Sequence, residues 1–234
     1  QGLREYLGGM ADQVDGYPFD QMVRIGTYNT VMRANWKVAM DAFNESYHVP
    51  TVHLGSLPGS ASSEANPASV PTSVRFHGPH RSMTPYNNPA YMPPHTALVV
   101  GKYGPTFVTE KGGYPGTNPN NDDGWWFDAN IHFPNFVTLL GKGWYLTYNF
   151  WPVDESHTRW QMNVYQPRAT NAGGMLANEH TRVHLRDTLL EDFGTVEHTQ
   201  EMLESGVLDG LTVSEPEVAV RHQLWTVMQW LARP

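Results

Sequence analysis

Hydrophobic and polar positions follow different periods along the chain, and the changes of period divide it into segments. From Arg33 to His48, apolar residues are interleaved with polar ones, which predicts a helix that stops at Pro50. Residues 54–124 are rich in Pro, Gly, Asn and Ser, which predicts long surface excursions with a short helix or strand near 97–102. Long loops of this kind often form lids or the walls of substrate-binding sites.

The second half of the chain changes to strand-like and then helical patterns. From Trp126 onward, runs of β-branched and aromatic residues are broken at 141–143 and 154–156, which predicts three antiparallel strands joined by hairpin turns. A long helix is predicted at about 175–205, and a final helix at 214–231 begins with a Ser-Glu-Pro-Glu sequence typical of a capping box. This order predicts an α+β fold, with helices packed on one face of an antiparallel sheet.

Composition narrows the class of protein. The 234 residues, 40% hydrophobic and with eight Trp, are enough to bury a good-sized core. The net charge of -8 gives no electrostatic basis for binding nucleic acid or an anionic membrane, and no apolar run is long enough to span a bilayer. The first residues carry no signal peptide, so a cytoplasmic location is expected, and the start without Met suggests a fragment or processed product.

The absence of cysteine restricts the available chemistry. It excludes a disulfide framework, a thiolate nucleophile and a cysteine-bound iron–sulfur cluster within these residues. Histidine, in contrast, occurs 11 times. A metal site in this chain must therefore use nitrogen and oxygen ligands.

The densest polar cluster on an otherwise apolar segment is DAFNESYHVPTVH. On a helix, Asp41, Glu45 and His48 would share one face. His53 follows five residues after His48, just past Pro50. A single isolated histidine is more often a core or surface residue than a ligand. Two histidines that flank a helix stop, behind two carboxylates, indicate a possible metal site.

A third ligand is expected from the predicted long helix, because two imidazoles leave a divalent metal short of ligands. Asp192 lies on an apolar stripe between Leu189 and Val196, whereas Asp187 and Glu191 fall on another face that is predicted to be wet. A carboxylate on a buried stripe is costly unless a cation or several donors compensate it. A metal would do so, as would a buried Arg or a Trp N–H.

Two imidazoles and one carboxylate form a site with open coordination positions. This donor set is the facial triad of non-haem Fe(II) oxygenases. Zinc hydrolases are the competing assignment, although the H-E-x-x-H pattern is absent. A small-molecule binding module without catalysis is a third interpretation.

Two motifs resemble those of a known family. NWKVAMDAFNESYHVPTVH resembles the iron-site signature of Rieske ring-hydroxylating oxygenase α subunits, and LLEDFGTVEHTQ resembles the helix that carries their third ligand. The resemblance covers nearly the whole chain. It implies that His48, His53 and Asp192 bind Fe(II), and that Glu45 bridges toward the Rieske cluster of a neighbouring subunit. It also implies a helix-grip fold (Bet v 1/START-like), with an antiparallel sheet packed against a long C-terminal helix.

The resemblance further implies the reaction and its partners. We expect residues 1–234 to form a single catalytic domain that hydroxylates an apolar, aromatic substrate, as a mono- or dioxygenase, with O2. The electrons would come from a reductase or ferredoxin through a [2Fe–2S] Rieske cluster in a missing N-terminal domain or a partner. Homotrimers or α3β3 assemblies are expected. Four residues are predicted to line the substrate pocket: Phe43, Asn44, Phe150 and Trp151.

Overall fold

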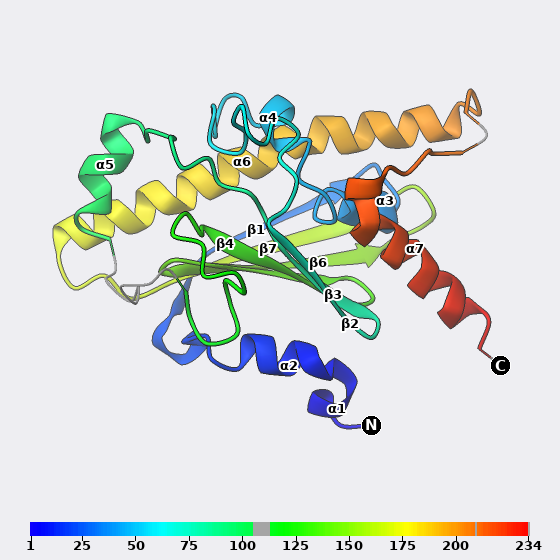
Figure 1. The fold of residues 1–234 in the computed structure, drawn as a ribbon, viewed down its shortest axis with the longest axis horizontal. Coiled ribbons are helices and arrows are strands. Elements are labelled where there is room, and N and C mark those ends of the chain that lie inside the picture. Colours follow the sequence, from blue (N-terminus) through cyan, green and yellow to red (C-terminus); the bar gives the residue numbers. More distant parts are fainter. Residues whose placement is uncertain (105–112, 209, 234) are drawn as a thin grey trace.

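The computed structural model describes residues 1–104, 113–208 and 210–233. Within these residues, seven strands form one antiparallel sheet in the order β1-β7-β6-β5-β4-β3-β2 (Figure 1). The strands are β1 (Val23–Met32), β2 (Ser73–His77), β3 (His80–Thr84), β4 (Phe127–His132), β5 (Phe136–Gly141), β6 (Trp144–Pro152) and β7 (Thr158–Gln166).

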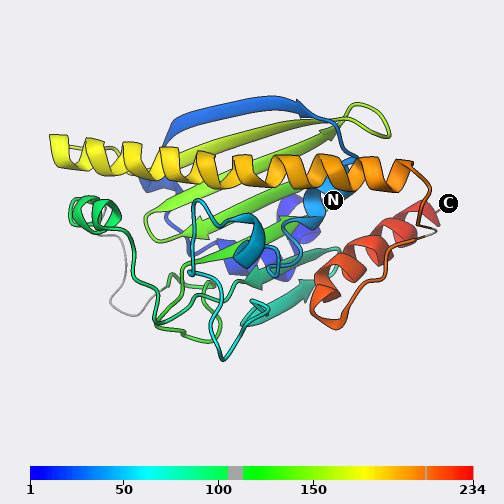
Figure 2. The ribbon, with the colours of Figure 1, turned by 90° about the horizontal axis from the view of Figure 1, so that it is seen from above.

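Helices cover both faces of this sheet. The long helix α6 runs along one face, while α1 and α2 lie against the other (Figures 1 and 2). The helices are α1 (Leu3–Leu7), α2 (Gly9–Val14), η1 (Phe19–Gln21), α3 (Trp36–Asp41), α4 (Val49–Val52), α5 (His95–Gly101), α6 (Ala172–Glu204), η2 (Glu215–Glu217) and α7 (Val218–Leu231). The expected α+β, helix-grip arrangement of an antiparallel sheet against a long C-terminal helix is therefore confirmed.

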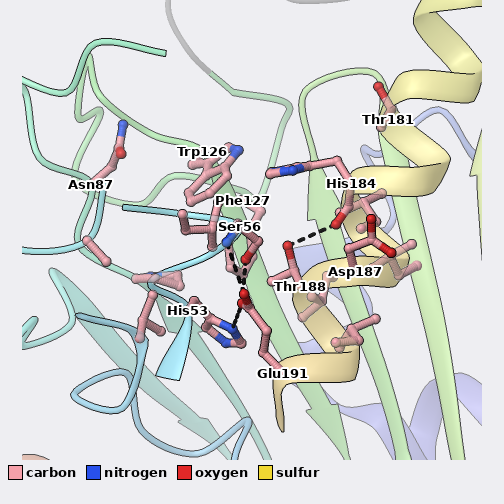
Figure 3. A pocket seen from close by; sticks show the side chains of 18 of the residues that line it. His53, Ser56, Asn87, Trp126, Phe127, Thr181, His184, Asp187, Thr188 and Glu191 are labelled. Carbon is pink, nitrogen blue, oxygen red and sulfur yellow. Dashed lines mark hydrogen bonds and ion pairs between the residues drawn. The ribbon is translucent and has the colours of Figure 1, made fainter. Parts of the chain in front are cut away.

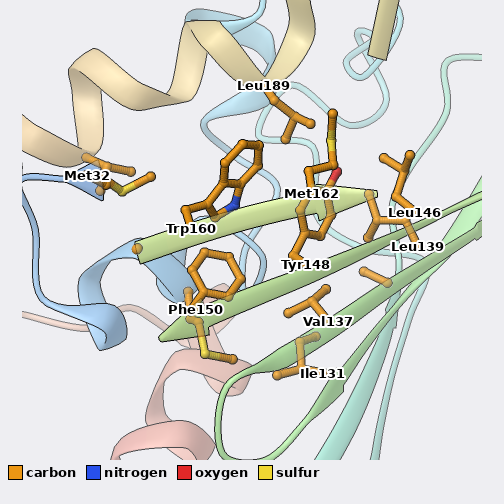
Figure 4. Close-up of a cluster of buried hydrophobic side chains, with 14 of the residues drawn as sticks. Met32, Ile131, Val137, Leu139, Leu146, Tyr148, Phe150, Trp160, Met162 and Leu189 are labelled. Carbon is orange, nitrogen blue, oxygen red and sulfur yellow. The ribbon is translucent and has the colours of Figure 1, made fainter. Parts of the chain in front are cut away.

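Strand periodicity sets the core. Alternate residues of β6, among them Leu146, Tyr148 and Phe150, are buried on the face that packs against Leu189 and Val196 of α6 (Figure 4). Each large apolar side chain buried in this way stabilises the fold by about 1.5–3 kcal/mol. The layer between sheet and helix is thus the main core, and it fixes α6 against the sheet.

The helix predicted from Arg33 to His48 is wrong in extent, because α3 ends at Asp41. The Asn44 side chain donates to the Met40 carbonyl oxygen at 3.1 Å, a local bond that competes with helix continuation. Pro50 does not stop a helix but lies in the first turn of α4, where its missing N–H costs nothing. The chain therefore turns between two short helices.

The strand predictions are partly correct. The hairpin turns at 141–143 and 154–156 are confirmed, but Pro134 divides the first predicted strand into β4 and β5, since proline interrupts a strand ladder. The stretch predicted as loops also contains the hairpin β2–β3, which turns at Gly78 (φ 60°). The short helix or strand predicted near 97–102 is present as the helix α5. Strand β1 was not predicted.

The two C-terminal helices are confirmed within a few residues of the predicted ends. Asn171 is the N-cap of helix α6, and its side chain accepts a hydrogen bond from the Gly174 N–H. The capping box at Ser214 and Glu217 is present, although its first turn is a 3-10 turn. None of the helices in the described part of the chain combines the length and apolar character that a membrane crossing requires.

Candidate metal centre

The two candidate histidines flank a single helical turn. His48 is the N-cap and His53 the C-cap of α4, so the four-residue helix holds both imidazoles on one side. Their ring centroids are 5.2 Å apart and the ring planes are inclined by 71°. Helix α6 packs beside α4 and brings Asp192 to the same point (Figure 1).

Three donor atoms converge there. Asp192 Oδ1 lies 3.6 Å from His48 Nε2 and 3.2 Å from His53 Nε2. All three donor atoms lie within 4.8 Å of one another. Ligand atoms at about 2.1 Å from a metal and at right angles to one another are separated by about 3 Å, so this spacing fits one ion.

The remaining ring nitrogens are held by carboxylates. His48 Nδ1 is hydrogen-bonded to Glu45 Oε1, and the His48 backbone N–H donates to Glu45 Oε2 at 3.1 Å. His53 Nδ1 is hydrogen-bonded to Glu191 Oε2 at 3.0 Å (Figure 3). A protonated Nδ1 leaves the Nε2 lone pair free for a metal. Two such lone pairs and a carboxylate oxygen form a donor set that can hold one cation.

Ser56 fixes the outer carboxylate. The Ser56 backbone N–H and hydroxyl donate to Glu191 at 3.0 and 2.6 Å (Figure 3). Burial works to raise the pKa of Glu191, but the hydrogen bonds from Ser56 and His53 outweigh it and lower the pKa. Burial also works to lower the pKa of His53, and Asp192 and Glu191 outweigh it, so the net pKa is raised. The pocket thus attracts positive charge, a proton or a metal ion.

A cavity of about 730 Å3 opens beside this centre. Helix α6 contributes a polar wall, with His184, Asp187 and Thr188 (Figure 3). Strands contribute an apolar wall, with Leu139 and Leu146. Among the described residues that line the cavity there is no Lys or Arg.

The predicted pocket residues separate in the structure. Phe43 lines the cavity, but Asn44, Phe150 and Trp151 do not. The Asn44 amide donates to Gln223 Oε1 at 3.0 Å, and Phe150 is fully buried in the core. Trp151, at the end of β6, is 46% exposed. The cavity wall comes instead from strand residues nearer the other end of the sheet face that carries Phe150, whereas strand alternation places Trp151 on the opposite face.

Glu191 is the functional candidate that helical periodicity missed. Its side chain is 24% exposed, not on a wet face, because the turn after His53 folds over this shoulder of α6. The one signal in the sequence was that Glu191 is adjacent to Asp192. Asp187, in contrast, is exposed as predicted.

Tyr47, which precedes His48, is half exposed. Its hydroxyl donates a hydrogen bond to Glu217 at 3.1 Å.

Comparison with protein families gives one match that spans most of the chain. The model described as "Ring hydroxylating alpha subunit (catalytic domain)" matches residues 19–233. No curated protein matches the chain.

Solved structures share the fold at low identity. The quaternary ammonium Rieske monooxygenase CntA, in complex with an inhibitor, is 15% identical with a TM-score of 0.70, over 98% of this chain and 56% of that chain. Naphthalene 1,2-dioxygenase from Rhodococcus sp., bound to indole, is 15% identical with a TM-score of 0.66, over 100% of this chain and 63% of that one. NdmA of Pseudomonas putida CBB5 is 12% identical with a TM-score of 0.54, over 89% and 50%. This chain thus spans about half to two thirds of each.

Proposed function

Because the chain belongs to the family of ring hydroxylating alpha subunits, as their catalytic domain, we propose that it is the iron-binding catalytic part of an oxygenase. One observation carries the proposal. His48 Nε2, His53 Nε2 and Asp192 Oδ1 converge within 4.8 Å, while both Nδ1 atoms are held by carboxylates. Ferrous iron is the ion that such a set of two imidazoles and one carboxylate serves in oxygenases.

The residues of this chain would have separate tasks. When bound in a facial triad with open positions, Fe(II) supplies the activation of O2. Glu45 and Glu191 keep the imidazoles in the tautomer that presents Nε2, and Ser56 holds Glu191 in place. The apolar wall of strands β4–β6 would hold an aromatic, apolar substrate beside the triad and exclude water.

Electrons would arrive from outside these residues. The family implies a Rieske [2Fe–2S] cluster, and the sequence contains no cysteine to hold one, so we propose that another domain or a partner carries it. Glu45, bonded to His48, is the proposed contact toward the cluster of a neighbouring subunit. A reductase or ferredoxin, a trimeric or α3β3 assembly and a cytoplasmic location complete the proposal.

Metal content tests this proposal directly. Anaerobic loading with Fe(II) should give about one iron per chain, measured after removal of free metal. His48→Ala, His53→Ala and Asp192→Ala should each abolish stoichiometric loading. His198→Ala and Glu201→Ala, which alter exposed residues of α6 outside the cavity, are the matched controls and should load like the wild type.

The same loading experiment separates the alternatives. Full iron occupancy in Asp192→Ala would remove the third ligand. Absence of iron from the wild type would favour a binding module on the same fold. A stable zinc complex in place of iron, with no electron paramagnetic resonance signal after nitric oxide is added, would favour a zinc hydrolase.

A further inference from the structure

The hydroxyl of Tyr148 is a buried polar group without a protein partner. Tyr148 projects from β6 toward α6 and lines the cavity beside the candidate metal centre (Figure 4). Its side chain is fully buried, and its Oη atom has no hydrogen-bond partner among the described residues. An unsatisfied buried hydroxyl costs about 1–3 kcal/mol, so a partner supplied by a ligand would remove that cost.

The hydroxyl can act as a donor. A phenol with an ordinary pKa of about 10 is protonated at neutral pH, so it has a hydrogen to donate. The rings of Phe43 and Trp160, with centroids 4.9 and 5.8 Å from that of Tyr148, offer no strong acceptor. No acceptor among the described residues lies within hydrogen-bond distance of the hydroxyl, so a group that enters the adjoining cavity can accept a hydrogen bond from it.

The charges around the cavity limit what that group can be. Glu45 is bonded to His48, Glu191 to His53, and Asp187 Oδ1 to the guanidinium of the adjacent Arg186 at 2.7 Å. No Lys or Arg lines the cavity in the described part of the chain, so an anionic substrate would lose its hydration without a cation to compensate it. An ammonium group with four carbon substituents has no lone pair, so it cannot accept a hydrogen bond from the hydroxyl.

We propose that Tyr148 is a substrate-binding residue, and that its hydroxyl donates a hydrogen bond to an uncharged acceptor on the aromatic substrate. A ketone, an ether or a ring nitrogen would be such an acceptor. The inference rests on the proposed function for the aromatic substrate in the cavity. The hydrogen bond itself needs no iron, so its test is independent of metal loading.

Three naphthalene derivatives of similar shape test the proposal by binding to metal-free protein. They are 2-acetylnaphthalene, 2-isopropenylnaphthalene and 2-naphthoate. The first two differ mainly in a carbonyl oxygen against a methylene group. Dissociation constants from calorimetry should show the acetyl probe about 5- to 10-fold tighter than the isopropenyl probe, and the anionic naphthoate probe weaker than the acetyl probe.

Tyr148→Phe should abolish the preference for the acetyl probe while binding the isopropenyl probe as tightly as the wild type does. The thermal midpoint of this variant should not fall, because the hydroxyl has no partner to lose. Tyr145→Phe, a buried tyrosine on the opposite face of the same strand, is the matched control and should keep the preference.

Three outcomes would overturn the inference. They are a preference for the acetyl probe that survives in Tyr148→Phe, binding of the naphthoate probe that is tighter than that of the acetyl probe, and no binding of any probe at millimolar concentration. Failure of iron loading with an intact Tyr148-dependent preference would instead count against the proposed function alone.

Discussion

Two polar clusters share the segment from Asp41 to His53 and take their other members from distant parts of the chain, yet their internal chemistry differs. We call them the inner cluster (Asp41, Asn44, Arg81 and Gln223) and the metal cluster (Glu45, His48, His53, Glu191 and Asp192). In the inner cluster, donors meet acceptors: Arg81 donates to Asn44 and Gln223, and the Gln223 amide donates to Asp41 at 3.1 Å. One Arg81 nitrogen, Nη1, is without a partner among the described residues.

In the metal cluster, the outer ring nitrogens of the two histidines have hydrogen-bond partners, but the inner ones both point at one acceptor. Both Nδ1 atoms have carboxylate partners, whereas both Nε2 atoms face the same Asp192 oxygen. A buried group of donors and acceptors can stabilise a fold by itself, but a group of converging lone pairs needs a cation. Complementarity within a cluster therefore separates a structural role from a ligand-binding one better than polarity or burial does.

Substitution of Arg81 is expected to have the largest effect, and it tests whether the inner cluster supports the fold without affecting metal binding. Its side chain is almost fully buried, and Arg81→Met would leave Asp41 and Gln223 without its charge and donors. We expect the free energy of unfolding to fall by about 3–5 kcal/mol, with iron stoichiometry unchanged in the folded protein. Urea denaturation and metal analysis measure the two quantities. Arg24→Met, at an exposed position of β1, is the control. Loss of iron in Arg81→Met would show that the two clusters do not act independently.

The second prediction concerns pH. Burial raises the pKa of Asp41 from 3.8 to about 7, although Arg81 opposes the shift and Glu45 and Glu217 add to it. The folded state therefore holds this proton more tightly, and the stability it contributes is lost as pH rises from about 4 to 7. Relative to Asp41→Asn, the wild type should lose up to about 4 kcal/mol over that range. Parallel curves for the two proteins would contradict this.

Glu191→Ala tests the metal cluster separately from the inner cluster. It removes the partner of His53 Nδ1, so Fe(II) affinity should fall about 10- to 100-fold while the stability of metal-free protein changes little. Competitive chelation measures the affinity, and Glu201→Ala, exposed on the same helix, is the control. An unchanged affinity would show that the outer carboxylate does not orient the imidazole.

The smallest effect is expected from Ser56→Ala. The variant keeps the backbone N–H that donates to Glu191 and loses only the hydroxyl that donates at 2.6 Å. Fe(II) affinity should fall less than in Glu191→Ala, by about 2- to 10-fold. A larger loss than in Glu191→Ala would indicate that Ser56 acts other than through Glu191.

Much of the fold could be predicted because its signals are local. The C-terminal helix and the turns at 141–143 and 154–156 follow from periodicity and turn residues. The break after Asp41 could not, because it depends on the Asn44 side chain, which bonds to the backbone of α3 and to α7. The stop assigned to Pro50 was wrong for a related reason: proline favours the first turn of a helix as much as it ends one.

The site shows the same division between local and distant information. Residue type and spacing brought forward His48, His53 and Asp192, and the structure places their donor atoms together. Glu191 was assigned to the solvent side, since a helical projection cannot show that a distant turn covers it. The cavity walls could not be predicted for a similar reason: Phe150 lies on the sheet face toward α6 but outside the cavity, and strand alternation places Trp151 on the opposite face.

The hydrogen bond between His53 and Glu191 joins residues 138 positions apart. The donor atoms of the metal cluster are thus scattered in an unfolded chain and assembled only in the native one. An ion at one hundred times its dissociation constant would add about 2.7 kcal/mol to the stability of the native chain. A shortage of the ion would then lower the fraction of folded protein, so the ion concentration would affect the amount of native protein as well as its activity.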